Sequence, residues 1–186
     1  MAGDATNVDL WQDADVYVAD LESTAPTDVV TALDAAFDLV GLLDGDEGFT
    51  ETREEESEER YAWGSLLVKK TRGKHKRTIK FVALEDNDTT FAIANPGSTR
   101  SGTSGIGTVQ TSEVSVPSYV EKMVVLETRE GEKLRRRIVE RCDIEMTGEV
   151  KDSESAVTVY EFTITVLPDD NGVLYTDLEG LDPAGS

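Results

Sequence analysis

The clearest hydrophobic pattern in the chain is an alternation of apolar and polar positions near its C-terminus. Every second position from 160 to 166 is apolar, namely Tyr160, Phe162, Ile164 and Val166. A period of two residues places these side chains on one face of a strand, which is typical of a sheet with one buried face. The pattern therefore predicts a strand over 159–166.

Other segments rich in β-branched and aromatic residues also favour strands. They comprise residues 16–19, 65–71, 78–85, 89–94, 119–127 and 138–147. The second and third are joined by Arg72-Gly-Lys-His-Lys-Arg, where Gly73 favours a hairpin turn. In the last segment, we expect Ile138, Cys142, Ile144 and Met146 on the apolar face, which Glu140 interrupts, and Val139 and Arg141 on the other face.

One segment, residues 27–40, has the pattern of an amphipathic helix. Its apolar residues recur at helical spacing, at Val29, Val30, Leu33, Ala36, Phe37 and Val40. Thr27 can cap its start, and Gly41 is a natural stop. With about seven or eight strands, the chain is expected to be mainly β, an antiparallel β-sandwich or barrel flanked by this one helix.

Two long segments lack either period and are predicted to be loops. Residues 41–62 are acidic, with nine Asp or Glu and two Arg between positions 44 and 60, and this density of like charge disfavours an isolated element. Residues 95–117 are rich in Gly, Ser and Thr. We expect both loops to be mobile in the monomer and to order on assembly. A flexible N-terminal arm, 1–15, and an acidic C-terminal tail, 173–186, then flank one domain over 16–172.

The composition argues against several classes of protein. A net charge of −20 over 186 residues disfavours ordinary nucleic-acid binding, which needs Lys and Arg to displace counterions from phosphates. The sequence contains neither a secretory signal nor an apolar run long enough to span a membrane. A single cysteine forbids an intrachain disulfide framework and fits a reducing cytoplasm.

Neither of the two residues best suited to nucleophilic or acid–base chemistry lies in a pattern that indicates catalysis. The only histidine, His75, is in the basic Lys/Arg-rich turn, where a solvated side chain is expected. Cys142 lies on the apolar face of a strand, as a small buried hydrophobe does. We therefore predict that the protein is not an enzyme.

Two strings resemble ligand-binding motifs without meeting their requirements. The string from Asp44 to Glu55 echoes a calcium loop, but Phe49 occupies the position that needs glycine. The string from Gly97 to Gly102 has the glycine spacing of a phosphate-binding loop without its lysine. We expect no metal and no cofactor.

Acidic and basic residues are segregated along the chain. The basic group is Lys69, Lys70, Arg72, Lys74, Lys76 and Arg77. The acidic group is Glu54, Glu55, Glu56, Glu58 and Glu59. Charge runs are usually solvated faces, yet an acidic loop and a basic hairpin on one molecule are complementary, and such surfaces repeated head-to-tail generate rings or filaments. We predict inter-subunit contacts at these eleven residues; the sequence identifies no lumen-facing residue.

The order of the segments also carries a family resemblance. The matching strings are Val16-Tyr-Val, Ser23-Thr-Ala-Pro-Thr, Leu33-Asp-Ala-Ala-Phe, Asp46-Glu-Gly, Trp63-Gly, Thr78-Ile-Lys-Phe-Val-Ala-Leu-Glu-Asp-Asn and Thr163-Ile-Thr-Val-Leu-Pro-Asp-Asp-Asn-Gly. In this order they resemble the major tail tube proteins of non-contractile, long-tailed bacteriophages, especially phages of actinobacteria. The resemblance covers most of residues 16–172 and rests on order and spacing.

The resemblance implies a structural virion protein with a β-sandwich-like tube fold. Its subunits would form hexameric rings that stack into a hollow tail tube, after synthesis in the host cytoplasm. The implied partners are other copies of the chain, the tape-measure protein, and the tail terminator and tip proteins, with no membrane. Genomic DNA would pass through the lumen without specific binding, because acidic side chains repel phosphates within the roughly 8 Å that physiological salt leaves unscreened.

Two other functions stay open at this point. A β-sandwich binding or capsid-decoration module would fit the fold, although such a module usually displays exposed aromatic residues or a metal site, and the chain has two Trp and five Tyr. An acidic hydrolase with paired carboxylates would fit the composition, although the sequence indicates no ordered pair.

Overall fold

The fold, a computed structural model that describes residue 3 and residues 8–181, is mainly β. Within these residues it has ten strands and one short helix. Their bounds are β1 (Asp13–Asp20), β2 (Asp38–Leu39), β3 (Thr50–Tyr61), β4 (Leu67–Ala83), α1 (Asp88–Ala94), β5 (Thr99–Ser101), β6 (Thr111–Glu113), β7 (Glu121–Glu130), β8 (Lys133–Met146), β9 (Tyr160–Val166) and β10 (Thr176–Leu181). The mainly β, antiparallel prediction is confirmed.

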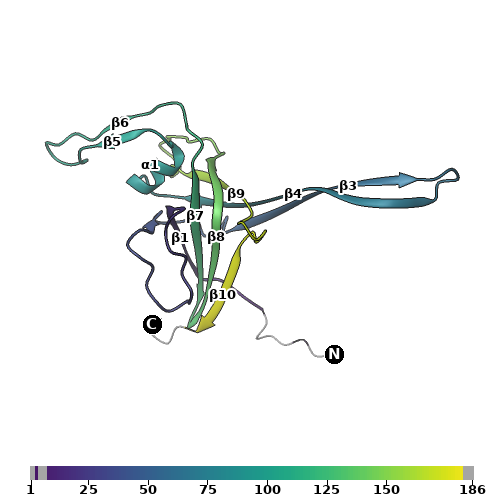
Figure 1. The fold of residues 1–186 in the computed structure, drawn as a ribbon. Coiled ribbons are helices and arrows are strands. Elements are labelled where there is room, and N and C mark those ends of the chain that lie inside the picture. The colour runs from purple at the N-terminus through teal and green to yellow at the C-terminus, as the bar shows by residue number, and fades with distance from the viewer. Residues whose placement is uncertain (1–2, 4–7, 182–186) are drawn as a thin grey trace.

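The main sheet closes on itself into a small barrel. Its strands follow the order β2-β1-β7-β8-β9-β4-β3, and β10 pairs with the first half of β8. The short stretch 38–44 joins the two sides: Val40 N–H donates to the carbonyl of Val16 on β1, and Leu43 bridges to Ala83 on β4. Figure 1 shows the body of the molecule and the two hairpins, β3–β4 and β5–β6, that project from it.

The barrel interior is an apolar core to which β1, β4, β7, β8 and β9 all contribute. Phe81 of β4 stacks on Phe162 of β9 with ring centroids 5.1 Å apart. Val16, Val124 and Cys142 lie in the same cluster and are fully buried. Burial of this apolar area is the main force that holds the strands together.

A β-bulge in β8 corrects the predicted assignment of its faces. Val124 pairs with Val139 and Lys122 pairs with Cys142, so two residues of β8, Glu140 and Arg141, oppose one residue of β7. The extra residue shifts the alternation by one position. Val139, which the sequence pattern placed opposite Cys142, is therefore buried in the same interior.

The predicted helix over 27–40 is wrong. Residues 27–37 form turns that cover the outer face of β1, β7 and β8, burying Val29 and Phe37, and residues 38–39 form strand β2. The guanidinium of Arg136 donates to the carbonyls of Asp28 and Thr31, which a helix would have used for its own hydrogen bonds. Asp28 in turn caps the amides of Val30 and Thr31 as a local turn.

The helix lies instead at α1, where the sequence predicted a strand over 89–94. Asn87 caps it: the side-chain oxygen of Asn87 accepts from the amide of Thr90 at 2.8 Å. Thr90, Phe91 and Ile93 face the body and are buried. A helix of seven residues with three buried positions is too short for its hydrophobic pattern to show whether the segment is a helix or a strand.

Three further expectations are corrected. Residues 65–85 are not a hairpin turning at Gly73 but one long strand, β4, and its partner β3 occupies most of the predicted loop 41–62. The predicted loop 95–117 contains the small β5–β6 hairpin. Part of the predicted tail 173–186 is strand β10, and residues 182–186 lie outside the described residues.

Candidate assembly arms

The most prominent feature of the molecule is a two-stranded arm formed by residues 52–76 of β3 and β4. Strand β9 pairs with β4 only from Arg77 onward, so beyond this point the hairpin has no third strand. Each residue from 52 to 76 is exposed. Figure 1 shows the hairpin running straight away from the body. Because an isolated two-stranded hairpin is only marginally stable in water, this long arm is suited to ordering against a partner.

The structure brings the eleven charged residues predicted to make inter-subunit contacts together in this one hairpin. The five glutamates lie on β3 and the six basic residues on β4. Glu59 pairs with Lys70 at 2.9 Å, and Glu56 lies 3.8 Å from Lys74. Hydrogen bonds from Tyr61 and then Lys70 hold the pKa of Glu59 below its usual value. Acidic and basic surfaces therefore face each other within one copy, and their contact with a second copy stays a prediction.

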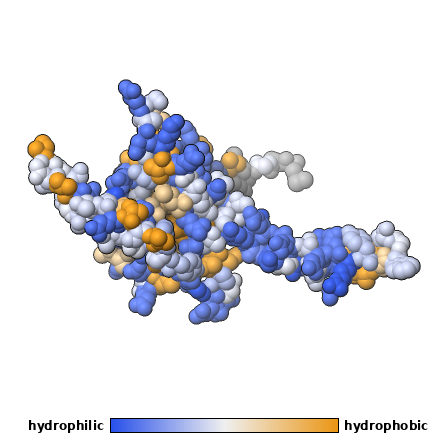
Figure 2. All heavy atoms as spheres, turned by 90° about the horizontal axis from the view of Figure 1, so that it is seen from above, coloured by the Kyte–Doolittle hydropathy of each residue, from blue (hydrophilic) through white to orange (hydrophobic). Residues whose placement is uncertain are grey.

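The tip of the long arm is apolar, which the sequence did not single out. The chain reverses through Ala62–Leu66, with Gly64 and Ser65 both in the left-handed region. Trp63 is fully exposed and the side chain of Leu66 is 69% exposed. Figure 2 shows apolar residues near the ends of both projecting hairpins. The sequence Trp-Gly alone does not indicate that the Trp side chain is exposed, because this exposure results from the projection of the arm away from the body.

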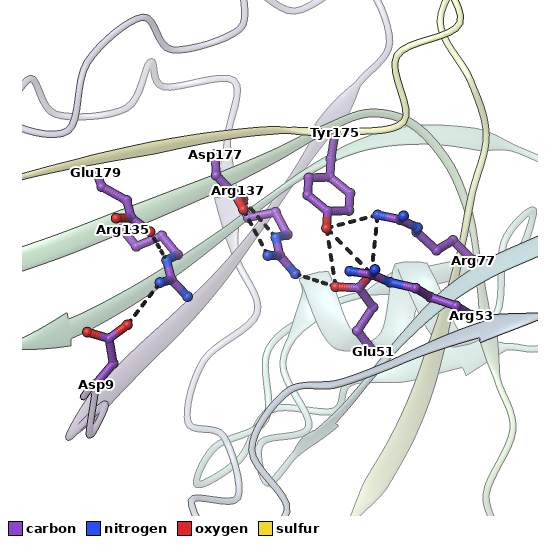
Figure 3. Close-up of polar contacts among 9 residues, drawn as sticks. All are labelled: Asp9, Glu51, Arg53, Arg77, Arg135, Arg137, Tyr175, Asp177 and Glu179. Carbon is purple, nitrogen blue, oxygen red and sulfur yellow. Dashed lines mark hydrogen bonds and ion pairs between the residues drawn. The ribbon is translucent and has the colours of Figure 1, made fainter. Parts of the chain in front are cut away.

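An ionic cluster clamps the root of the long arm to the barrel (Figure 3). The carboxylate of Glu51 on β3 accepts from Arg53 at 3.0 Å and Arg137 at 3.0 Å, and lies 3.3 Å from Arg77. Arg77 also donates to the hydroxyl of Tyr175 at 3.0 Å. The cluster therefore ties β3 and β4 to β8 and to the segment before β10.

The same cluster is fixed from its far side by β10. Asp177 accepts two hydrogen bonds from Arg137, at 2.8 and 2.9 Å, which is the bidentate geometry that holds a guanidinium most firmly. The Arg137 guanidinium also stacks 4.2 Å from the ring centroid of Tyr175. Burial raises the pKa of Glu51, but the hydrogen bond from Arg53 and the nearby guanidinium charges outweigh it, so its pKa lies below the usual value.

The N-terminal segment is also attached to β8. Two cations of β8 lie over the ring of Trp11: Lys133 and Arg135, whose guanidinium carbon is 4.5 Å from the ring centroid. Asp9 pairs with the same two cations, and its pKa is lowered chiefly by the hydrogen bond from Lys133. The predicted flexible arm 1–15 is therefore wrong for residues 8–15, while residues 1–2 and 4–7 lie outside the described residues.

A second, shorter arm is formed by the β5–β6 hairpin, residues 99–113. It projects from the opposite side of the body to the long arm (Figure 1). Its end exposes Ile106 and Val109 to solvent. Arg100 anchors its base, 2.7 Å from Asp86 and stacked over the ring of Phe91 at 4.1 Å. The molecule therefore has two arms on opposite sides of its body, and each arm ends in exposed apolar residues.

The residues considered for chemistry lie apart from one another. His75 is exposed in the middle of the long arm, opposite Glu55, and not in a turn. Cys142 is buried in the barrel, where desolvation raises the pKa of its thiol. Within residue 3 and residues 8–181, no group of three His, Cys, Asp or Glu side chains converges as metal ligands. In that same part of the chain, no helix has the length and apolarity to cross a membrane.

Comparison with known proteins identifies the family of the chain. The family model described as phage tail tube protein matches residues 1–179 of the chain. This match spans the barrel, both arms and most of β10. A search of curated proteins found no match to the sequence.

Proposed function

We propose a function from one premise: this chain belongs to the phage tail tube protein family and is a structural protein of the virion tail. Its copies form hexameric rings, and the rings stack into the hollow tube that conducts phage DNA to the host. The role is that of a building unit and not of an enzyme. Membership in the family favours this role over a binding or capsid-decoration module.

The observation that carries the proposal is the long arm. A barrel with a full apolar core does not need 25 exposed residues in one hairpin to fold. Ordering such a hairpin has an entropic cost that the isolated chain does not recover. A neighbouring subunit recovers it by covering the strands and their apolar tip. The short arm on the opposite side gives the same body a second place to meet a neighbour.

The charge of the chain supports a passive conduit for DNA. The chain has a net charge of −20, and those of its acidic side chains that line the lumen repel the phosphate backbone within the roughly 8 Å that physiological salt leaves unscreened. The genome therefore passes through the lumen without specific binding. Further partners of the tube are the tape-measure protein and the tail terminator and tip proteins. The subunits are made in the host cytoplasm before they enter the tail.

Electron microscopy of the purified protein tests the proposal. With increasing concentration, we expect six-fold rings and then tubes of uniform width. A matched variant replaces residues 54–76 by an Asn-Gly turn, which joins the cross-strand partners Arg53 and Arg77 and closes the hairpin near its root. Because the arm makes no core contact, this variant should fold and stay monomeric. A wild-type protein that sediments as a monomer at every concentration contradicts the proposal, whereas an armless variant that still forms tubes would show that the long arm is not the contact that joins the subunits.

A further inference from the structure

The tip of the long arm has the character of a docking group. Trp63 is fully exposed, and Tyr61 and Leu66 beside it are 58% and 69% exposed. Trp is among the residues that contribute most binding energy when buried at an interface, and a cluster of exposed apolar side chains marks an interaction site. The described chain leaves Trp63 uncovered and covers less than half of Tyr61 and Leu66.

A collar of positive charge lies directly below the tip. Arg60 on β3 and Lys69 on β4 are direct cross-strand partners, so their side chains lie on one face. Like charges in this position repel. The neighbouring cation Lys70 is paired with Glu59, whereas Arg60 and Lys69 form no ion pair within residues 8–181. The collar is therefore suited to an acid supplied from outside the chain.

A pocket of the matching character lies near the root of the arm. It has a volume of about 720 Å³, and its apolar lining includes Leu10, Trp11, Leu39, Leu42, Leu43 and Phe49. Leu10 and Leu42 are 69% and 67% exposed, so their side chains are available for contact. Each charged residue that lines the pocket is acidic. Two of them, Asp44 and Glu85, form no ion pair in the described part of the chain.

We propose that the tip of one copy docks into this pocket of a second copy. Trp63 packs against the leucines of the pocket, while Arg60 and Lys69 face its carboxylates. The proposal rests on the proposed function, because it names the contact through which tail subunits join. Apolar and charged complementarity both favour a second copy of this chain as the occupant.

The arm cannot reach the pocket of its own chain. The stretch Leu67–Lys76 is unpaired with the body and spans about 33 Å as an extended strand. It leads straight away from the root near which the pocket lies (Figure 1). Tip and pocket are also different surfaces, so their contact is heterologous and repeats from copy to copy into a ring or filament.

Disulfide trapping between copies tests the contact. Leu66→Cys protein is mixed with Leu42→Cys protein under mild oxidation; native Cys142 is buried and does not interfere. We expect a disulfide-linked heterodimer. The matched control pairs Leu42→Cys with Val157→Cys, a residue that is 71% exposed. A yield no higher than that of the control overturns the proposal.

A second experiment uses sedimentation to measure the protein concentration at which assemblies first form. We expect this concentration to rise at least about tenfold in Trp63→Ala and, separately, in the double variant Arg60→Glu with Lys69→Glu, as it does when an interface hot spot is lost. The control Lys151→Glu, on another exposed loop, should leave it unchanged. Unchanged assembly in the tip variants overturns the contact.

The two proposals can fail separately. Rings or tubes that form without the Leu66–Leu42 cross-link overturn the docking contact and leave the proposed function standing. Cross-linked dimers from a protein that forms no rings support the contact and count against the proposed function.

Discussion

The clamp at the root of the long arm gives the sharpest test of how the arm is held. Glu51→Gln keeps the shape of the side chain and removes the charge on which Arg53, Arg77 and Arg137 converge at 3.0 to 3.3 Å. Hydrogen bonds to charged groups each contribute about 1.5–3 kcal/mol. Arg137 keeps Asp177, but Arg77 loses its only carboxylate among the described residues. We therefore expect a loss of about 2–3 kcal/mol in the free energy of unfolding.

Urea unfolding measures this loss. With a slope of about 2 kcal/mol per molar urea, the midpoint should fall by roughly 1 M. Glu54→Gln is the matched control: it lies on the same strand, is exposed and forms no ion pair in the described chain, so it should cost less than about 0.5 kcal/mol. Equal midpoints for the two variants would refute the role of Glu51 as a clamp.

The dependence on pH provides a second check on the same clamp. The pKa of Glu51 is depressed in the folded state. Its stabilising contribution is therefore fully present above the pKa of a carboxyl group in the unfolded chain, about 4.3, and is lost as the pH falls through the lower folded value. The difference between wild-type and Glu51→Gln should shrink below about pH 4. A difference that stays constant down to pH 2 would show that shape and not charge is responsible.

Two further predictions concern the body. Arg136→Ala removes one of the two guanidinium partners of the buried Glu127 carboxylate, which keeps Arg129 at 2.6 Å, and should cost about 1.5–3 kcal/mol in urea unfolding, whereas a change below about 0.5 kcal/mol would rule out this pairing as a structural element. The thiol of Cys142 is buried and its pKa is raised, so a thiol reagent should modify native protein only at the rate of unfolding. Rapid labelling of folded protein would contradict this burial.

Strands whose alternation is set by one buried face could be predicted from the sequence. The pattern Tyr160 to Val166 became β9, and the apolar runs at 16–19 and 119–127 became parts of β1 and β7. These segments pair with neighbours that share their period, so local pattern and tertiary contacts agree. The same agreement explains why the order of segments sufficed to indicate the family.

The arms could not be predicted, because their two strands have no buried face. The acidic run of β3 was predicted as a loop on the ground that like charges repel. That argument considers the acidic strand alone, whereas the basic strand β4 pairs with it and supplies positive charges that compensate the repulsion between its glutamates. Only pairing across the hairpin shows that the acidic and basic groups are two sides of one structure.

The sequence by itself determined the mainly β class, the family and the segregation of charge, since these follow from composition and from periods within single segments. Only the tertiary structure decided where the helix lies, that the sheet closes into a barrel, and that one hairpin projects with its apolar tip uncovered. These features depend on contacts between residues far apart in the chain, such as Arg136 with the carbonyls of Asp28 and Thr31. A pattern that extends over a few residues carries no information about such contacts.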